Sequence, residues 1–323
     1  MKRICITGAR GFIGQHLVQR LMQAGYPLTL AVRRVAGSAS SSEGRIVEVG
    51  DIGEGTDWRR ALEDCGVVVH LAGQTPAPGV SADLFRRVNE AGTARLAAQC
   101  AGAGVETLIF LSSIFAVVDH TFAGVVDDAV EPRSTTPYGR SKLAAEAHIR
   151  AFTGEGRTGV SLRPPLVYGA QAKGNWHSLQ RLAASGLPLP FGSVRNRRSL
   201  ISVENLCDAI VHIVGQSGDV TKAGAFAVAD AEAVSLADML RLLRAGMKLS
   251  PRLLPVPPAM LTAGLGLLGR TVMGQSLVGD LAVDSSRFRE TYGWTPPERA
   301  EDAIQRSGRA FAAQGKHGVR TGG

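Results

Sequence analysis

The sequence predicts an α/β fold in which a doubly wound parallel β-sheet is followed by a smaller C-terminal α/β lobe. Three observations support this prediction. Short apolar runs alternate with helical patterns through the first half of the 323-residue chain, as in successive βαβ units. A glycine-rich segment directly follows the first apolar run. After Pro164, prolines and glycines interrupt the alternation, which indicates a second and less regular part of the chain.

The apolar runs of the first half are rich in Val, Ile and Leu, as expected for parallel strands that are covered on both faces. The predicted strands are Arg3–Thr7, Leu28–Arg33, Arg45–Val49, Val67–Leu71, Thr107–Ser112 and Gly159–Arg163. The predicted helices between them are Phe12–Ala24, Asp57–Asp64, Asp83–Ala101 and Tyr138–Phe152. The Ser/Gly/Ala-rich segment Val35–Gly44 is expected to be a mobile loop.

The pattern divides the chain into two parts. We assign residues 1–165 to the sheet domain and expect the chain to return to it at about residues 203–228. Residues 166–202 and 229–312 form the smaller lobe, and residues 313–323 are expected to be a flexible tail.

The longest apolar stretch is Pro258–Val272, which is shorter than the roughly 20 apolar residues of a membrane span. Glycines and Arg270 interrupt it. We therefore expect a helix packed on protein and no integral membrane segment, with a role at a membrane surface as the less favoured alternative.

Composition narrows the kinds of partner. The net charge of +8 and the pI of about 9.7 favour anionic ligands in general. Aromatic residues make up only 5% and no block of five basic residues occurs, so a nucleic-acid partner is poorly supported. The four cysteines lack metal or redox spacing, which indicates buried thiols, no metal site and a reducing compartment. No signal-like segment opens the chain, so we expect a cytoplasmic protein.

The glycine-rich segment has the spacing of a dinucleotide site. Gly8, Gly11 and Gly14 lie between the first predicted strand and the first predicted helix. Such glycines permit a tight turn, let a pyrophosphate approach the backbone and let the helix pack on the strand. The free N–H groups of the helix then face the phosphates.

The end of the second predicted strand favours NADP(H). Arg33 and Arg34 occupy the place where an NAD site usually has a carboxylate, and a guanidinium matches a 2′-phosphate. The alternatives are a pair of solvated arginines and an NAD(H) cofactor. Asp51 is a candidate partner for the adenine amino group, or else a turn or helix cap.

Three polar residues form a catalytic pattern. Tyr138 and Lys142 stand one helical turn apart, and Ser113 ends the strand run that precedes them. A free phenol is a poor catalyst at neutral pH, and a neighbouring ammonium is expected to lower its pKa. The serine hydroxyl would hold a substrate carbonyl or alcohol oxygen against the phenol. The pattern predicts acid–base catalysis coupled to a nicotinamide.

Together these motifs resemble the extended short-chain dehydrogenase/reductases of the NAD(P)-dependent epimerase/dehydratase group. The resemblance runs from Ile4 to about Ser307 and includes Val69–Gly73, Val88-Asn89 and Arg163–Gly169. It implies a Rossmann domain with a sugar-nucleotide lobe, catalysis by Ser113, Tyr138 and Lys142, and a homodimer. That dimer would form through the helices at Asp83–Ala101 and Tyr138–Phe152. The further cofactor-binding residues that it implies are Phe12, Ile13, Ile52, Leu71, Ala72, Gly73 and Pro165, with Tyr138 and Lys142 at the nicotinamide ribose.

The second half is similar to UDP-sugar-binding segments of bacterial UDP-N-acetylhexosamine 4-epimerases and UDP-4-keto-6-deoxy-N-acetylhexosamine 4-reductases. The similarity assigns Arg198 to the diphosphate, with a surface charge as the alternative. It assigns Asn175 to the sugar-phosphate or the uracil, with a helix N-cap as the alternative. The segment Ile114–His120 departs from the relatives at the place where the sugar ring would lie.

The resemblance leads to one preferred function. Arg33 and Arg34 favour NADPH, and a net reductase exchanges its cofactor at each cycle. We therefore expect NADPH-dependent reduction of the C4 ketone of a UDP-4-keto-6-deoxy-N-acetylhexosamine, in the synthesis of a surface polysaccharide such as O-antigen (lipopolysaccharide). The first alternative is a UDP-N-acetylhexosamine 4-epimerase with retained NAD. A non-catalytic NADP-binding regulatory protein is the remote alternative, which the complete Ser113, Tyr138 and Lys142 set disfavours.

Overall fold

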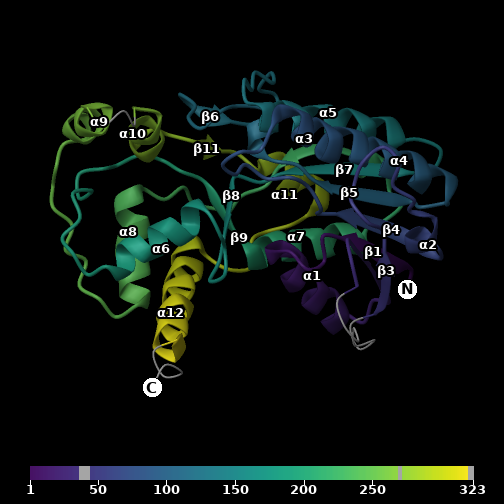
Figure 1. Cartoon of the computed structure of the whole chain (residues 1–323), viewed down its shortest axis with the longest axis horizontal. Coiled ribbons are helices and arrows are strands. Elements are labelled where there is room, and N and C mark those ends of the chain that lie inside the picture. Colours follow the sequence, from purple (N-terminus) through teal and green to yellow (C-terminus); the bar gives the residue numbers. More distant parts are fainter. Residues whose placement is uncertain (36–43, 268–270, 319–323) are drawn as a thin grey trace.

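A seven-stranded parallel sheet forms the centre of the computed structural model, which describes residues 1–35, 44–267 and 271–318 (Figure 1). The strand order is β10-β7-β5-β4-β1-β2-β3. The strands are β1 (Arg3–Thr7), β2 (Leu28–Val32), β3 (Arg45–Glu48), β4 (Cys65–His70), β5 (Thr107–Leu111), β7 (Thr158–Arg163) and β10 (Gly224–Ala227). The six strands predicted in the first half are confirmed to within two residues at each end. The order reverses between β1 and β4, where doubly wound sheets bind their ligands.

Helices cover both faces of this sheet, so the doubly wound prediction is confirmed. In Figure 1, α1 (Phe12–Gln23) and α7 (Val203–Gly215) lie below it. The helices above it are α3 (Ala82–Phe85), α4 (Gly92–Gly102) and α5 (Pro137–Phe152), and α2 (Arg59–Leu62) lies at the right-hand edge and shares a core with α4. Alternate side chains of a strand enter the two cores: Ile4 and Ile6 pack with α1, whereas Cys5 packs with α4. All four cysteines are buried free thiols.

The predicted helix at Asp83–Ala101 is interrupted by a π-helical turn, η2 (Arg86–Ala91), between α3 and α4. Buried Asn89 lies in this turn and bonds the loop after β4: its Oδ1 accepts the Gln74 N–H at 2.7 Å. Its Nδ2 donates to Ser141 Oγ on α5 at 3.0 Å. The wide turn thus ties together three segments that surround the candidate site.

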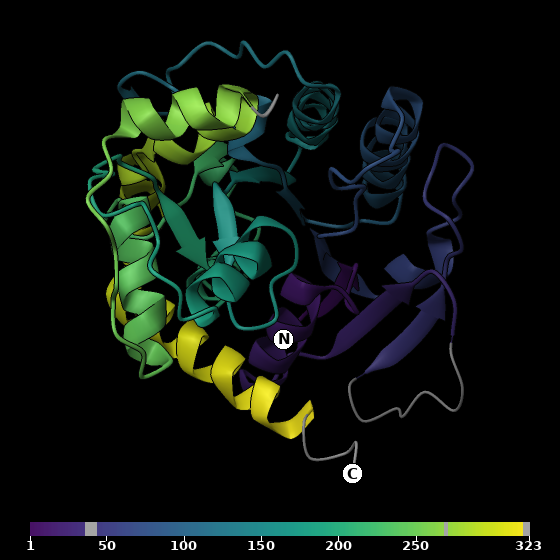
Figure 2. The same ribbon diagram turned by 60° about the vertical axis from the view of Figure 1, so that its left-hand side comes forward.

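The second part of the chain builds a lobe around Tyr168, Trp176, Leu240 and Ile304. Its elements include α6 (Asn175–Ala184), α8 (Leu236–Gly246), α9 (Pro258–Leu267), α10 (Thr271–Val278) and α12 (Ala300–Gly318). Two small sheets pair β8 (Leu166–Tyr168) with β9 (Leu200–Ser202), and β6 (Val125–Val126) with β11 (Ala282–Val283). Figures 1 and 2 show α8 and α12 side by side and α9 at the outer end of the lobe. The helix α11 (Ser286–Tyr292) instead packs on β10 and belongs to the core of the sheet domain.

Two expectations differ from the structure. The predicted helix Asp57–Asp64 is reduced to α2. The helix α12 continues to Gly318, so residues 313–318 are helical where a flexible tail was expected, and residues 319–323 lie outside the described residues. The helix α9 packs against α10, as its apolar sequence predicted, although none of its residues is fully buried. Of the expected loop Val35–Gly44, residues 36–43 lie outside the described residues. No helix in the described ranges is long and apolar enough to cross a membrane.

Candidate active site

The turn between β1 and α1 forms a cradle at the reversal of strand order. Gly8 has φ +70°, and a Cβ atom there would lie 2.8 Å from the Ala72 amide nitrogen after β4. A Cβ atom at Gly14 would overlap the Gly8 carbonyl oxygen. Gly11 caps α1 and donates its N–H to that same oxygen at 2.9 Å. Gly8 and Gly14 therefore tolerate only glycine, and the turn leaves the N-terminus of α1 open to an anion.

A cleft of about 1060 Å³ opens in front of this turn. The predicted cofactor residues that line it are Gly8, Gly11, Arg33, Arg34, Asp51, Ile52, Leu71, Ala72 and Gly73. Phe12, Ile13 and Gly14 lie behind it in α1, and Pro165 is buried after β7. The cradle and the length of the lining fit a dinucleotide.

Arginines gather at the rim of the cleft that lies beyond β2. Arg33 Nε bonds Asp51 Oδ1 at 2.8 Å, with the two side chains 76% and 82% exposed. Asp51 is therefore neither a turn nor a helix cap but the partner of a cation. Arg10 Nη1 bonds the Arg34 carbonyl oxygen at 3.0 Å. Arg10 and Arg87 also line the cleft, and sequence reasoning missed both because only folding brings them to β2.

Ser113 and Tyr138 meet at the carboxyl end of β5. Ser113 caps the short 3₁₀ turn η3 (Ile114–Ala116), and Tyr138 is the second residue of α5. Burial raises the pKa of Tyr138 to about 12, and a hydrogen bond with the Ser113 side chain opposes that rise. The expected lowering of this pKa by the Lys142 ammonium is wrong for the cofactor-free chain. The phenol is therefore an acid in this state.

Gly139 explains why the two hydroxyls come so close. A Cβ atom at this position would overlap the Phe115 carbonyl oxygen of η3 and the Ser134 hydroxyl. Only glycine allows α5 to press against the turn that Ser113 begins. The ring of Phe85 packs edge-on against Tyr138, with 5.7 Å between centroids.

Lys142 links the catalytic pair to the cleft. Its Nζ donates to the Leu111 carbonyl oxygen at 2.9 Å and lies over the Phe110 ring. A Cβ atom at Gly73 would lie 3.2 Å from the same Nζ, so the ammonium borders the loop that lines the cleft. Burial lowers the pKa of Lys142 to about 8, and Glu146 one turn further along α5 opposes this shift.

A buried ion pair supports this arrangement from behind. Arg163, at the end of β7, binds the carboxylate of Glu146 through two nitrogens, at 3.0 and 2.6 Å. Ser112 donates its hydroxyl to Glu146 Oε1 at 2.5 Å. Both charged side chains are less than a tenth exposed. The pair therefore ties β7 to α5, which carries Tyr138 and Lys142, and to the end of β5, which Ser113 follows.

The two predicted substrate residues lie apart from the catalytic pair. Asn175 is exposed as the first residue of α6, where Gly174 is the N-cap, so the N-cap alternative for Asn175 is wrong. Arg198 donates to the carbonyl oxygens of Ser276 at 2.9 Å and Gly279 at 3.1 Å. It is therefore no free surface charge: it ties the end of α10 to the strand region beside β9. His120 packs its ring on Phe115.

The site joins a proton donor, an oriented hydroxyl and an ammonium at the end of a dinucleotide-sized cleft. This arrangement can move a proton on and off an oxygen while hydride moves at the attached carbon. Among the described residues, no group of three or more His, Cys, Asp or Glu could hold a metal ion.

Comparison with known proteins agrees with this geometry. Residues 4–229 match the NAD dependent epimerase/dehydratase family. A Vibrio cholerae protein named UDP-glucose 4-epimerase is 36% identical over 320 residues, covering 96% of this chain and 95% of its own length. The Bacillus cereus UDP-N-acetylglucosamine 4-epimerase has a similar structure, with a TM-score of 0.78, 19% identity, and coverage of 96% of this chain and 99% of its own. The Bacillus cereus UDP-glucuronic acid 4-epimerase in complex with NAD has a TM-score of 0.74, 19% identity, and coverage of 97% and 99%.

Proposed function

The chain belongs to the NAD-dependent epimerase/dehydratase family, and from this premise we propose that it is a UDP-sugar 4-epimerase that retains its NAD cofactor. One observation carries the proposal: the Tyr138 and Ser113 hydroxyls interact beside Lys142, whose Nζ borders the cleft loop at Gly73. The name of the Vibrio relative, which matches this chain over nearly its whole length, supports epimerisation. We therefore place the epimerase ahead of the reductase that Arg33 and Arg34 alone favoured.

The chain's own residues supply the proton chemistry. As a phenolate, Tyr138 would accept the proton of the sugar O4 hydroxyl, and as a phenol it would return that proton. Ser113 orients that oxygen, and Lys142 holds the nicotinamide ribose and stabilises the phenolate as it forms. A bound nicotinamide would supply the hydride chemistry at C4. Residues 1–165 would hold the cofactor, and the lobe would hold the UDP-sugar, with Asn175 and Arg198 as candidate ligands.

A second candidate is the NADPH-dependent 4-keto reductase. The observation that favours it is the arginine-rich rim formed by Arg10, Arg33 and Arg34, together with the absence of a carboxylate at the end of β2. Of the acids at this rim, Asp51 is paired with Arg33 and Glu48 accepts the Val35 N–H, while Glu54 also lines the cleft. Such a rim suits a 2′-phosphate, which NAD lacks. The homodimer through α3–α4 and α5 and the cytoplasmic location stay predictions under either candidate.

Release of the bound nucleotide distinguishes the two candidates. The purified protein is denatured, and the released nucleotide is identified by chromatography. The native protein is incubated with UDP-glucose and UDP-N-acetylglucosamine without added cofactor. An epimerase should release NAD and form the C4 epimer of one of these sugars. An empty protein that oxidises NADPH only with a UDP-4-keto sugar would establish the reductase.

A further inference from the structure

We propose that the outer end of the lobe docks this protein on an anionic lipid surface. We call this surface the lobe tip and define it by α9, the apolar residues Leu187, Leu249 and Leu254, and the basic residues Arg195, Lys248 and Arg252. Figure 1 shows α9 at the end of the lobe farthest from the seven-stranded sheet. The proposal goes beyond the reaction proposed above and does not depend on it.

The first observation is apolar exposure. No residue of α9 is buried, although the helix carries no charged side chain. Met260 is 65% exposed and Leu267 is 91% exposed, and both belong to α9. Leu187 and Leu254 are exposed by 64% and 50%. Single exposed apolar side chains need no explanation. In α9, Leu261 packs on the lobe core and Leu265 on α10, whereas Met260 and Leu267 stay in solvent. Exposure of one whole face of an apolar helix indicates a binding surface.

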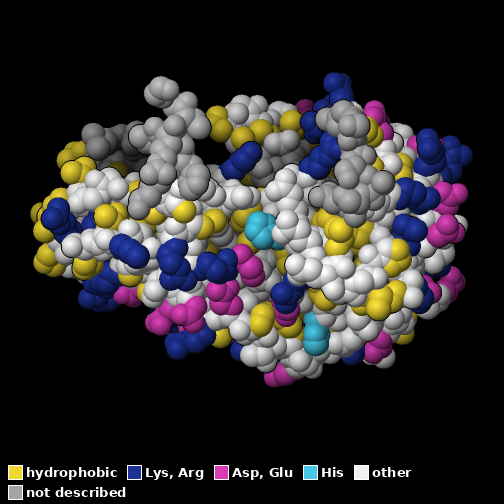
Figure 3. Space-filling model, turned by 90° about the horizontal axis from the view of Figure 1, so that it is seen from below, with side chains coloured by type: hydrophobic (Ala, Val, Ile, Leu, Met, Phe, Trp, Pro, Cys, Tyr) yellow, Lys and Arg dark blue, Asp and Glu magenta, His cyan; other side chains and the backbone are white. Residues whose placement is uncertain are grey.

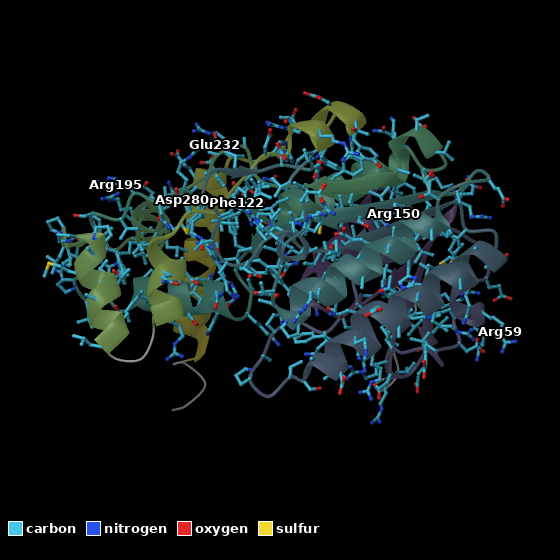
Figure 4. All side chains as sticks on the ribbon, turned by 90° about the horizontal axis from the view of Figure 1, so that it is seen from above. Arg59, Phe122, Arg150, Arg195, Glu232 and Asp280 are labelled. Carbon is cyan, nitrogen blue, oxygen red and sulfur yellow. The ribbon has the colours of Figure 1, made fainter. Side chains whose placement is uncertain are left out.

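The second observation is charge. The sequence has no Asp or Glu from residue 156 to 203, nor from residue 239 to 279, and these are the stretches that build the lobe tip. Arg195, Lys248 and Arg252 are exposed and make no ion pair with any described residue. Figure 3 shows hydrophobic and basic side chains bordering one another at the left-hand end. In Figure 4, Arg195 lies at the same end as α9, and Arg59 lies at the opposite end.

The loops that carry these side chains are held in place. Arg244 is fully buried and donates to the carbonyl oxygens of Leu187 and Pro251, each at 2.6 Å. Leu254 N–H bonds the Leu189 carbonyl oxygen at 2.8 Å, and Gly192 N–H bonds that of Leu254 at 2.8 Å. The tip is therefore a preformed surface, so binding would cost little ordering of the chain.

Lys248 and Arg252 add a further sign of a functional surface. Their φ angles are +60° and +35°, in the left-handed region that side chains other than glycine rarely adopt. Strain of this kind persists where the surrounding structure imposes it, and it is frequent at binding sites. Both backbones flank the exposed Leu249.

A lipid surface matches both properties of the tip. Apolar side chains of α9 would enter the boundary between headgroups and acyl chains, while the Arg and Lys side chains meet anionic headgroups. A second copy of this chain fits less well, because two copies of an acid-free basic surface would repel each other. The helix α10 follows α9, and Arg198 ties the end of α10 to His120.

Vesicle sedimentation tests the proposal with the full-length protein. Phosphatidylcholine vesicles are compared with vesicles that also contain phosphatidylglycerol. We expect binding to the anionic vesicles alone, and weaker binding at higher ionic strength. The double variants Met260→Asp/Leu267→Asp and Lys248→Glu/Arg252→Glu should each reduce the apparent partition coefficient at least tenfold. Their thermal unfolding and NAD(P) binding should equal those of the wild type.

Matched variants away from the tip provide the control. Met22→Asp/Val220→Asp and Arg59→Glu/Arg150→Glu change exposed side chains of the same kinds and should leave vesicle binding unchanged. The proposal is overturned if the wild type ignores anionic vesicles, or if the control variants lose as much binding as the tip variants. It is also overturned if the α9 variant turns a dimer into a monomer, since a second copy would then occupy the tip.

Discussion

Burial shifts the pKa values of Tyr138 and Lys142 in opposite directions, because it favours the neutral form of both side chains. The phenol rises to a pKa of about 12, and the ammonium falls to a pKa of about 8. Near neutral pH the cofactor-free site therefore holds a protonated phenol beside an ammonium. That is the state that gives a proton to a sugar oxygen.

Removal of the Tyr138 hydroxyl should slow the reaction without weakening cofactor binding. We expect Tyr138→Phe to lower kcat by about 10²–10⁴-fold, the usual contribution of general acid–base catalysis. Cofactor affinity should change little, because Tyr138 does not line the cleft. Steady-state kinetics and nucleotide titration measure the two effects, with Tyr26→Phe as the matched control. Normal turnover of the variant would remove Tyr138 from the mechanism.

The lowered pKa of Lys142 predicts a pH dependence. The side chain is an ammonium below a pH of about 8 and a neutral amine above it, so its charge is lost as the pH rises. We expect kcat/KM to fall as the pH rises through about 8. Lys142→Arg cannot lose its proton and should lack this limb, at a lower overall rate. A wild-type profile that stays flat to pH 9 would show that the ammonium is not required.

The arginine rim determines which cofactor binds more tightly. If Arg33 and Arg34 bind a 2′-phosphate, the Arg33→Ala/Arg34→Ala variant should bind NADPH about 10²-fold more weakly, from roughly 1.5 kcal/mol per contact. NADH affinity should barely change, since the exposed pair between Arg33 and Asp51 contributes little. Fluorescence titration of both cofactors measures this, with Arg59→Ala as the control. Equal and small effects on both would show solvated arginines and favour NAD.

Among the helices, strands and turns, those whose conformation has one dominant physical cause could be predicted best from the sequence. Apolar runs predicted six strands because both faces of the sheet are covered, and three glycines predicted the cradle because no side chain fits there. The π-helical turn at Asn89 could not be predicted, because it depends on contacts with Gln74 and Ser141 from other segments. The packing of α9 on protein agrees with its apolar sequence, but the exposure of Met260 and Leu267 could not be predicted, because an apolar sequence usually indicates burial.

The positions of the proposed catalytic residues could be predicted from local spacing, whereas the contacts of the proposed substrate residues could not. Ser113, Tyr138 and Lys142 could be predicted because a strand end and one helical turn fix their spacing. The carbonyl partners of Arg198 depend on how α10 folds back, which no local pattern contains. Of the cleft arginines, Arg10 and Arg87 were missed for this reason as well.

The buried pair of Glu146 and Arg163 should matter more for stability than any surface pair. Glu146→Leu leaves the Arg163 guanidinium buried without its partner, and we expect a loss of about 3–5 kcal/mol in the free energy of unfolding. The double variant Glu146→Leu/Arg163→Met should recover most of that loss, because no unpaired charge remains. Chemical denaturation measures both. A double variant as unstable as the single one would show that packing, not charge, dominates.

At the scale of the whole molecule, a buried polar cluster joins the two parts of the chain. Asp230 accepts hydrogen bonds from the Tyr168 hydroxyl at 2.8 Å and from the Asn205 amide at 2.7 Å. Asn205, on α7, also donates to the Glu298 carbonyl oxygen before α12. The cluster therefore fixes the lobe against the sheet domain, so the cleft and the catalytic end of α5 keep one position relative to the lobe.

The fate of the hydrogen at C4 tests the central claim most directly. The enzyme is incubated without added cofactor with UDP-glucose or UDP-N-acetylglucosamine that carries deuterium at C4, and the product is examined by NMR. We predict the C4 epimer with deuterium still at C4, because the same hydrogen leaves and returns within one site. Absence of any epimer, or an epimer whose C4 deuterium has been exchanged for solvent hydrogen, would contradict the account.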